Sequence, residues 1–378
     1  MKPKVLIFID WFLPGYKAGG PVTSNANMIN HLCKDFDFFV ITRNNDYSEN
    51  EPYKNIKPNE WTKSFNATIM YLSPDTINKS TFQKIISEQK FDFVFINGIY
   101  SLKFSILPLW LCKKNKLNTI VSVRGMLAST AIDIKGGKKK LFLRIAKSIG
   151  LYKNITFHAT NEQEKKDIEK TIGNQAQIKI APNLFEDKAI PALQNRVKNP
   201  GYIKLVNIAR IAPEKNLHYA LECLKNLKIK IDFDIYGPVY NEAYYNRCLV
   251  IAKSFPGNIN VQFKGSIEPE NINKTLSEYH LFFMPTLGEN FGHVILQSLS
   301  AGTPVLISDK TPWRNLKQQN VGADLPLKDV KSFTNYIEEV CTLNQPNYNE
   351  MSMTAYELAI NFTTNKDSIL QNKALFTK

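Results

Sequence analysis

The sequence lacks an apolar run long enough to cross a membrane, and it has only five cysteines and five histidines. A membrane-spanning helix needs about 20 apolar residues, whereas the apolar run near the N-terminus covers only Val5–Ile9 before Asp10. That run is also too short for a signal peptide. The five cysteines form no CxxC pair and have no histidines at ligand spacing, which argues against zinc and against a disulfide framework. We therefore expect a cytoplasmic protein without a metal.

Positive charge is concentrated in the first half of the chain. The net charge is +14, and residues 1–190 hold 28 Lys and Arg against 17 Asp and Glu, whereas residues 191–378 hold 20 against 17. A general richness in Lys and Asn does not explain this asymmetry, because both halves share it. The basic half predicts an anionic partner, such as a membrane surface, a phosphorylated lipid or nucleic acid.

Motifs of several function classes are also missing. The chain has neither a G-x-G-x-x-G dinucleotide fingerprint nor a nucleotide P-loop, and no nucleophilic triad is evident. It has no RNP-like aromatic pattern and no helix-turn-helix signature, which argues against nucleic-acid binding. With 43% hydrophobic and 22% charged residues, the composition is that of a folded globular protein.

What the chain does have is a regular alternation of strand-like and helix-like segments. This alternation predicts parallel sheets with helices on both faces, and 378 residues favour two such domains. The predicted strands of the first half are Val5–Ile9, Phe36–Ile41, Phe91–Ile96, Thr119–Val123 and Ile155–Ala159. Its predicted helices are Val22–Leu32, Thr81–Gln89, Leu102–Lys114 and Lys138–Ile149. The predicted strands of the second half are Ile203–Ile208, Ile231–Tyr236, Asn260–Phe263, Leu281–Met284 and Val305–Ile307.

A polar stretch with two prolines, Asn183–Gly201, separates the two runs. We predict an N-terminal domain over residues 1–190 and a C-terminal domain over 191–361. A last helix at about 362–378 is a candidate to pack back on the first domain. Open parallel sheets bind ligands at the carboxyl ends of their strands, so we expect the site in a cleft between two facing sheets.

The segment from Pro285 to Pro304 carries the most specific signal. A predicted strand ends in a short loop with one carboxylate, Glu289, and a helix-like run follows Gly292. The amides of residues 291–294 (Phe291, Gly292, His293 and Val294) then lie at a helix N-terminus, which favours anions. Amides for a phosphate beside a carboxylate for hydroxyls suit a sugar phosphate.

This segment resembles the donor-binding signature of family 4 glycosyltransferases. The resemblance implies the GT-B fold, in which two Rossmann-like doubly wound domains face each other, and a nucleotide diphosphate sugar as donor. In that family two glutamates stand eight positions apart, the first reaching the sugar and the second the ribose. Glu289 matches the first, and Gln297 takes the place of the second. Glutamine keeps a carbonyl acceptor but loses the charge, so we expect weaker ribose binding. Asn290 is expected among the donor contacts.

The segment Asn207–Asn216, after the first predicted strand of the second half, resembles a second family motif. Its Arg210 and Lys215 stand five positions apart, as do the family's cations for the diphosphate. Cations in place stabilise the charge that grows on a leaving nucleoside diphosphate. The alternative is a solvated arginine and a lysine that starts a helix.

Three weaker loops also match the family. Gly19-Gly20 resembles its N-domain glycine loop, and Gly237 lies in a turn like the one near the nucleotide. Arg124 follows a predicted strand at a point where many members carry a histidine, so it is expected to bind donor phosphate or an anionic acceptor. For each of these loops a structural turn is an equal alternative.

The resemblance implies a retaining glycosyltransferase that moves a hexose or amino-hexose from a UDP- or GDP-linked donor to a glycan acceptor on a lipid carrier. Such enzymes serve capsule or O-antigen type polysaccharide biosynthesis, and they commonly need no metal or other cofactor. Arg210, Lys215 and Glu289 are the expected catalytic residues. Two alternatives stay open: a nucleotide-sugar epimerase on the same fold, and a non-catalytic subunit that binds an anionic ligand.

One basic segment, Lys135–Lys153, stands apart from these motifs. On a helical wheel one stripe holds Phe142, Ile145, Ile149 and Tyr152, and another holds Lys140, Arg144 and Lys147. Basic amphipathic helices lie on anionic membrane surfaces, which predicts peripheral contact with the inner face of the cell membrane. The alternative is a core-facing helix with a solvated basic back.

Overall fold

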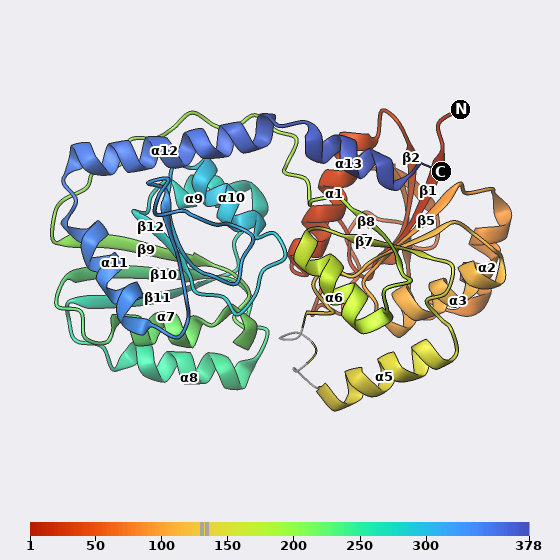
Figure 1. Cartoon of the computed structure of the whole chain (residues 1–378), viewed down its shortest axis with the longest axis horizontal. Coiled ribbons are helices and arrows are strands. Elements are labelled where there is room, and N and C mark those ends of the chain that lie inside the picture. Colours follow the sequence, from red (N-terminus) through yellow and green to blue (C-terminus); the bar gives the residue numbers. More distant parts are fainter. Residues whose placement is uncertain (129–131, 133–135, 378) are drawn as a thin grey trace. The chain divides into compact units, whose positions relative to one another are not determined.

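The computed structural model describes residues 1–128, 132 and 136–377, so Lys135 lies outside the described residues. The chain divides into two compact units, Met1–Asp187 with Lys366–Lys378, and Lys188–Asn365. Each unit is built on a largely parallel sheet with helices on both faces (Figure 1). The predicted α/β class with two Rossmann-like domains is therefore confirmed.

The first unit has an eight-stranded sheet in the order β3-β4-β2-β1-β5-β6-β7-β8. All neighbours are parallel except β3 and β4. Its strands are β1 (Lys4–Phe8), β2 (Asp37–Arg43), β3 (Trp61–Ser64), β4 (Ala67–Leu72), β5 (Phe93–Asn97), β6 (Thr119–Ser122), β7 (Thr156–Ala159) and β8 (Gln177–Ile180). Its helices are α1 (Gly20–Leu32), α2 (Lys79–Glu88), the π-helical turn η1 (Leu102–Ile106), α3 (Leu107–Lys114), α5 (Gly136–Ser148), α6 (Glu162–Ile172) and α13 (Asp367–Leu375).

Alternating residues of β1 show why this sheet is buried on both faces. Leu6 and Phe8 pack with α2, η1, α3, α5 and α6, whereas Val5 and Ile7 pack with α1 and the chain end after α13. Because side chains of a strand point alternately to its two sides, a strand buried on both sides must be apolar throughout. This continuous apolar run is why β1 could be predicted from the sequence as a buried strand.

The second unit has a six-stranded parallel sheet in the order β11-β10-β9-β12-β13-β14. Its strands are β9 (Tyr202–Ile208), β10 (Lys230–Tyr236), β11 (Ile259–Gly265), β12 (Leu281–Met284), β13 (Val305–Ser308) and β14 (Gly322–Leu325). Its helices are η2 (Pro213–Lys215), α7 (Leu217–Leu224), α8 (Glu242–Lys253), η3 (Pro269–Asn271), α9 (Ile272–Leu276), α10 (His293–Ser300), α11 (Val330–Thr342) and α12 (Gln345–Thr364). Helices α7, α8 and α11 share one apolar core with the sheet.

The stretch predicted as a polar linker is anchored in the second unit. Arg196 is buried and donates to the carbonyl of Gly302 at 2.8 Å and to that of Tyr279 at 3.2 Å. Lys198 is also buried, and its ammonium donates to the carbonyl of Cys341 at 2.8 Å. These bonds satisfy cations that could not otherwise be buried, so the segment from Lys188 onward is part of the second unit.

The C-terminal helix α13 packs on the first unit beside α1 (Figure 1). Phe376, just after the helix, is buried among aromatic rings, with its centroid 5.3 Å from that of Phe36 and 6.0 Å from that of Phe95. Lys373 forms an ion pair with Asp35 at 2.5 Å. The chain therefore leaves the first unit after Asp187 and returns to it at Lys366.

Truncating Phe376 should destabilise the first unit. Phe376→Ala leaves a cavity among aromatic rings, and we expect the free energy of unfolding to fall by about 3 kcal/mol. The control is Leu370→Ala on the same helix, where the side chain is 63% exposed and little change is expected. Urea unfolding measures both variants, and equal midpoints would contradict this packing.

Candidate functional site

The loops that follow β9 and β12 are held together at one edge of the second sheet. The two strands are parallel neighbours, so their carboxyl ends adjoin. The hydroxyl of Thr286 and the amide of Leu287 both donate to the carbonyl of Glu214, at 3.0 and 2.9 Å. In return, the side-chain amide of Asn216 donates to the carbonyl of Pro285 at 3.0 Å. These bonds fix the two loops that carry the predicted charged residues.

Lys215 and Glu289, which lie 74 positions apart in the chain, form an ion pair across these loops. Their side chains are only 18% and 13% exposed. The backbone of Glu289 is held as well, because its amide donates to the carbonyl of Lys310 at 2.9 Å. A mostly buried cation and anion are thus held side by side by the two loops.

Arg210 lies at the end of β9 in the same loop as Lys215. Its guanidinium is 3.7 Å from the carboxylate of Glu214 and lies over the ring of Tyr240 at 4.9 Å. A long ion pair between partly exposed groups contributes little, so a stronger anion can compete for Arg210. The loop after β9 therefore carries two cations, Arg210 and Lys215, of which Lys215 is paired with Glu289.

The helix α10 begins beside Glu289, as the sequence predicted. Gly292 has φ +78°, a left-handed conformation that favours glycine, and a Cβ there would lie 2.6 Å from Ile295 Cδ1. The amide of Ile295 donates to the carbonyl of Gly292 at 2.8 Å, which starts the helix. The preceding amides, from Phe291 to Val294, therefore stand at the helix N-terminus, where helix geometry supplies no carbonyl for them.

Aromatic packing fixes this helix start. The ring of Phe291 is buried, with its centroid 4.7 Å from that of His293 and 5.9 Å from that of Trp313. The indole of Trp313 donates to the carbonyl of Phe291 at 2.6 Å. Gln297 lies one turn into α10 and is partly buried, and Asn290 lies in the loop before the helix.

Gly237 lies against the backbone of the loop that carries Arg210, at a point where a larger residue would not fit. It follows β10 with φ +144°, and a Cβ there would meet the carbonyl oxygen of Ala209 at 1.9 Å. The glycine lets the turn after β10 approach the loop that carries Arg210. The structure thus brings together Arg210, Lys215, Glu289, Gly237 and the start of α10 within the second unit.

The remaining predicted residues belong to the first unit. Gly19 has φ +74° and is the N-cap of α1, which starts at Gly20. A Cβ at either glycine would meet no heavy atom within 4 Å, so the backbone there is open to approach. The carboxylate of Asp46 accepts hydrogen bonds from the amides of Tyr16 and Lys17, at 3.0 and 3.2 Å. These bonds anchor the loop that leads into Gly19-Gly20.

Arg124 lies in a polar network at the end of β6. It has φ +50°, and its guanidinium donates to the side-chain oxygens of Asn97, at 3.0 Å, and Asn183. The oxygen of Asn97 also accepts from Asn25 of α1 at 2.9 Å. Burial lowers the pKa of Arg124 to about 10, so the side chain stays charged at neutral pH. The Arg124 guanidinium is thus linked through Asn97 and Asn25 to α1, the helix that follows the glycine loop.

Three acidic residues in the first unit were missed from the sequence. Asp46 holds the glycine loop, and buried Glu164 accepts from the amide and hydroxyl of Thr160, at 2.6 and 2.7 Å. Asp10 directly follows β1, and it accepts from Ser101 at 3.0 Å and from Arg43 at 3.2 Å. Burial raises the pKa of Asp10, while Ser101 and Arg43 oppose that shift. Its position at a strand's carboxyl end was the signal that could have found it.

The described residues offer no cluster of three or more His, Cys, Asp or Glu side chains that could hold a metal. Within residues 1–128, 132 and 136–377, every helix is too short or too polar to cross a bilayer.

The second unit matches a known family. Residues 189–358, which contain Arg210, Lys215 and Glu289, match the family of glycosyl transferases group 1. No curated protein matches the sequence significantly.

Solved structures match the whole chain at low identity. Sucrose-phosphate synthase from Thermosynechococcus elongatus has a TM-score of 0.73 at 14% identity, over 100% of this chain and 98% of that one. HepE from Anabaena, solved in complex with UDP and glucose, has a TM-score of 0.71 at 13% identity, over 99% and 98%. WaaG, a glycosyltransferase involved in lipopolysaccharide biosynthesis, has a TM-score of 0.64 at 13% identity, over 98% of both chains. The likeness shows the GT-B fold for the chain, and the family match identifies a glycosyl transferases group 1 domain over residues 189–358.

Substitutions at the ion pair test the site. Lys215→Ala should lower the rate of donor turnover by about 10²–10³-fold, because a preplaced cation no longer stabilises the leaving diphosphate. Glu289→Ala should lower it as well, because a contact to the donor is lost. The controls are Lys253→Ala and Glu278→Ala, two exposed positions of the same unit. Near-normal rates in both site variants would show that the site lies elsewhere.

Stability separates a catalytic effect from a folding effect. Each single variant leaves one mostly buried charge unpaired, which is destabilising, whereas removing both charges relieves that penalty. We therefore expect Lys215→Met with Glu289→Gln to recover the urea midpoint of the unsubstituted protein while its turnover stays low.

Proposed function

We propose that this chain is a retaining glycosyltransferase of the family 4 type, which transfers a hexose or amino-hexose from a UDP- or GDP-linked donor to a glycan on a lipid carrier. The observation that carries the proposal is the Lys215–Glu289 ion pair at the N-terminus of α10. Two solved structures with this fold support a nucleotide sugar as donor, since one contains UDP and glucose and another contains UDP-2-fluoro glucose. The involvement of WaaG in lipopolysaccharide biosynthesis supports surface polysaccharide assembly.

In the proposed reaction, Arg210 and Lys215 hold the diphosphate together with the amides from Phe291 to Val294. Glu289 accepts hydrogen bonds from the sugar hydroxyls, and Gln297 accepts from the ribose. Gly237 and Asn290 border the nucleotide. These groups neutralise the pyrophosphate without a metal ion, because cations and helix amides stabilise the charge that develops.

The chemical step needs no protein nucleophile. The acceptor hydroxyl oxygen bonds to the anomeric carbon on the face from which the nucleoside diphosphate leaves, so the configuration is retained. The bond between that carbon and the phosphate oxygen breaks, and a donor phosphate oxygen takes the acceptor's proton.

Gly19-Gly20 and Arg124 of the first unit are proposed to border this centre, where Arg124 attracts an anionic group of donor or acceptor. The proposed location is the cytoplasm, at the inner face of the cell membrane.

The experiment that tests the function is turnover of a panel of UDP- and GDP-linked sugars with and without a lipid-linked glycan acceptor. The proposal expects release of nucleoside diphosphate that depends on the acceptor, and a product with the donor's anomeric configuration by NMR. Conversion of the donor sugar without any acceptor would instead identify an epimerase. Binding of nucleotide without turnover of any donor would indicate a non-catalytic subunit.

Gln297→Glu should tighten nucleotide binding. A carboxylate accepts two strong hydrogen bonds from ribose hydroxyls, where the amide offers one carbonyl, and a gain of roughly 1 kcal/mol corresponds to about fivefold in Kd. Calorimetric titration of UDP and GDP measures this effect. Gln262→Glu, on β11, is the matched control. Unchanged or weaker binding in Gln297→Glu would remove Gln297 from the ribose site.

A further inference from the structure

An exposed apolar surface lies on the first unit, on η1, α3 and α5. Leu102 of η1 is 74% exposed, Ile145 of α5 is 52% exposed, and Ile149 just after α5 is 66% exposed. Leu141 of α5 and Trp110 of α3 are exposed as well. We name these five side chains the η1–α5 face. Large apolar side chains gathered in this way usually mark a binding surface.

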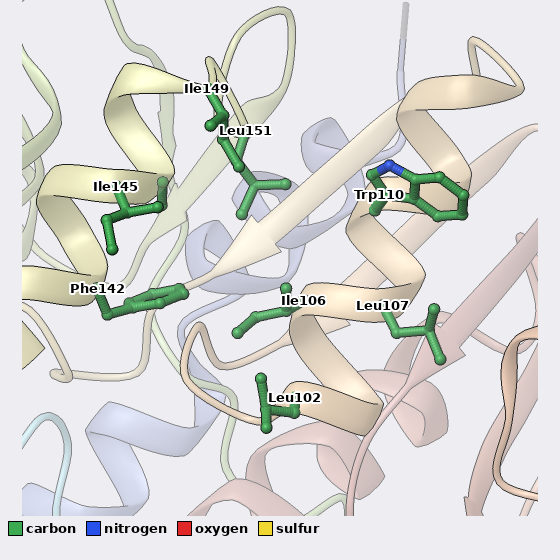
Figure 2. A pocket seen from close by; sticks show the side chains of 9 residues that line it. Leu102, Ile106, Leu107, Trp110, Phe142, Ile145, Ile149 and Leu151 are labelled. Atoms are coloured by element: carbon green, nitrogen blue, oxygen red, sulfur yellow. The ribbon is translucent and has the colours of Figure 1, made fainter. Parts of the chain in front are cut away.

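The face surrounds an open apolar pocket of about 290 Å³. Figure 2 shows Phe142 and Ile145 projecting from the α5 side, and Ile106 and Leu107 on the η1–α3 side. Its lining is aliphatic and aromatic throughout. A pocket without a converging polar group suits a hydrocarbon chain better than a sugar or a nucleotide.

Helix α5 carries both apolar and basic residues on its exposed surface. Leu141, Ile145 and Ile149 recur every four residues and are exposed, so the apolar stripe is not the core-facing side of the helix. Arg144 and Lys147 are also exposed. Arg144 borders this stripe beside Leu141, whereas Lys147 lies on the far side of the helix from Ile145. The helix buries other residues, Leu143 and Ala146, against the unit.

Positive charge gathers around the same face. Between residues 101 and 153 the sequence holds 12 Lys and Arg against one acidic residue, Asp133. The ring of Trp110 has the ammonium groups of Lys79 and Lys114 at 4.7 and 5.9 Å from its centroid. An amphipathic ring flanked by lysines is the arrangement found where proteins meet lipid headgroups.

We propose that the η1–α5 face docks on an anionic lipid bilayer, with Leu102, Ile145 and Ile149 inserted among the lipid chains and one chain seated in the pocket. The combination of apolar tips with a basic surround selects this occupant, because headgroup phosphates complement the charge while the chains cover the apolar side chains. A second copy of the chain is a poorer occupant, since two such basic faces repel. The inference rests on the proposed function only in that a lipid-linked acceptor would be met there.

Vesicle sedimentation tests the proposal with two kinds of vesicle, phosphatidylcholine alone and phosphatidylcholine with about one-third phosphatidylglycerol. We expect the protein to bind the anionic vesicles, because each basic residue near an anionic membrane surface raises the affinity about fivefold. Added salt should weaken this binding, because it screens the charges. Ile145→Ser with Ile149→Ser should weaken it at least tenfold. Arg144→Glu with Lys147→Glu should reduce binding to the anionic vesicles to the level seen with phosphatidylcholine.

The matched controls lie on the second unit. Val250→Ser with Met353→Ser removes two other exposed apolar side chains, and Lys228→Glu with Lys253→Glu reverses two other exposed charges. Both should bind vesicles as the unsubstituted protein does. Absence of vesicle binding, equal binding to both lipids, or equal loss in face and control variants would overturn the proposal. Conversion of a dimer to a monomer by the face variants, measured by light scattering, would assign the face to a second copy and overturn it too.

Failure of docking and failure of the proposed function give different results. UDP and GDP titrations report on the second unit alone, and the face variants should leave them unchanged. Vesicle binding without turnover of any donor would leave the docking face standing and refute the proposed function. Turnover of a water-soluble acceptor without vesicle binding would do the reverse.

Discussion

The ion pair between Lys215 and Glu289 is the interaction around which the second unit's site is organised. It joins two loops that are far apart in sequence but adjacent in space, because β9 and β12 pair in parallel. Burying either charge alone would cost several kcal/mol, about 3–5, and pairing the cation with the carboxylate offsets much of that penalty. They also keep each other in place, so a sugar diphosphate would find the groups for its phosphate and its hydroxyls already arranged.

Two glycines near the Lys215–Glu289 pair are required by the backbone conformation. Gly292 gives the left-handed turn that starts α10, and Gly237 permits contact between two loop backbones. Neither role needs a ligand, yet both bring amides and cations to the same edge of the sheet. Amides at a helix N-terminus and cations at the carboxyl edge of a parallel sheet are the features that the proposed diphosphate site requires.

The sequence predicted the buried parallel strands because they follow from local patterns. Short apolar runs located β1, β5 and β12, whereas Arg210, Lys215 and Glu289 were selected by the resemblance of their loops to family motifs. The edge strands β3, β8 and β14 were missed, since partly exposed strands such as Gln177–Ile180 lack a continuous apolar run. Strand β4 was missed as well, although it is almost fully buried. The roles of Asp46 and Glu164 could not be predicted either. They depend on which backbone amides the folded chain brings near, and no spacing in the sequence encodes that.

The central claim is that Arg210, Lys215 and the start of α10 bind the diphosphate of a nucleotide sugar. A crystal structure with UDP or GDP bound tests it most directly. The account predicts the β-phosphate within hydrogen-bonding distance of Arg210, of the Lys215 ammonium and of an amide between Phe291 and Val294. A nucleotide bound elsewhere, with the Lys215–Glu289 pair intact and no phosphate near it, would contradict the account.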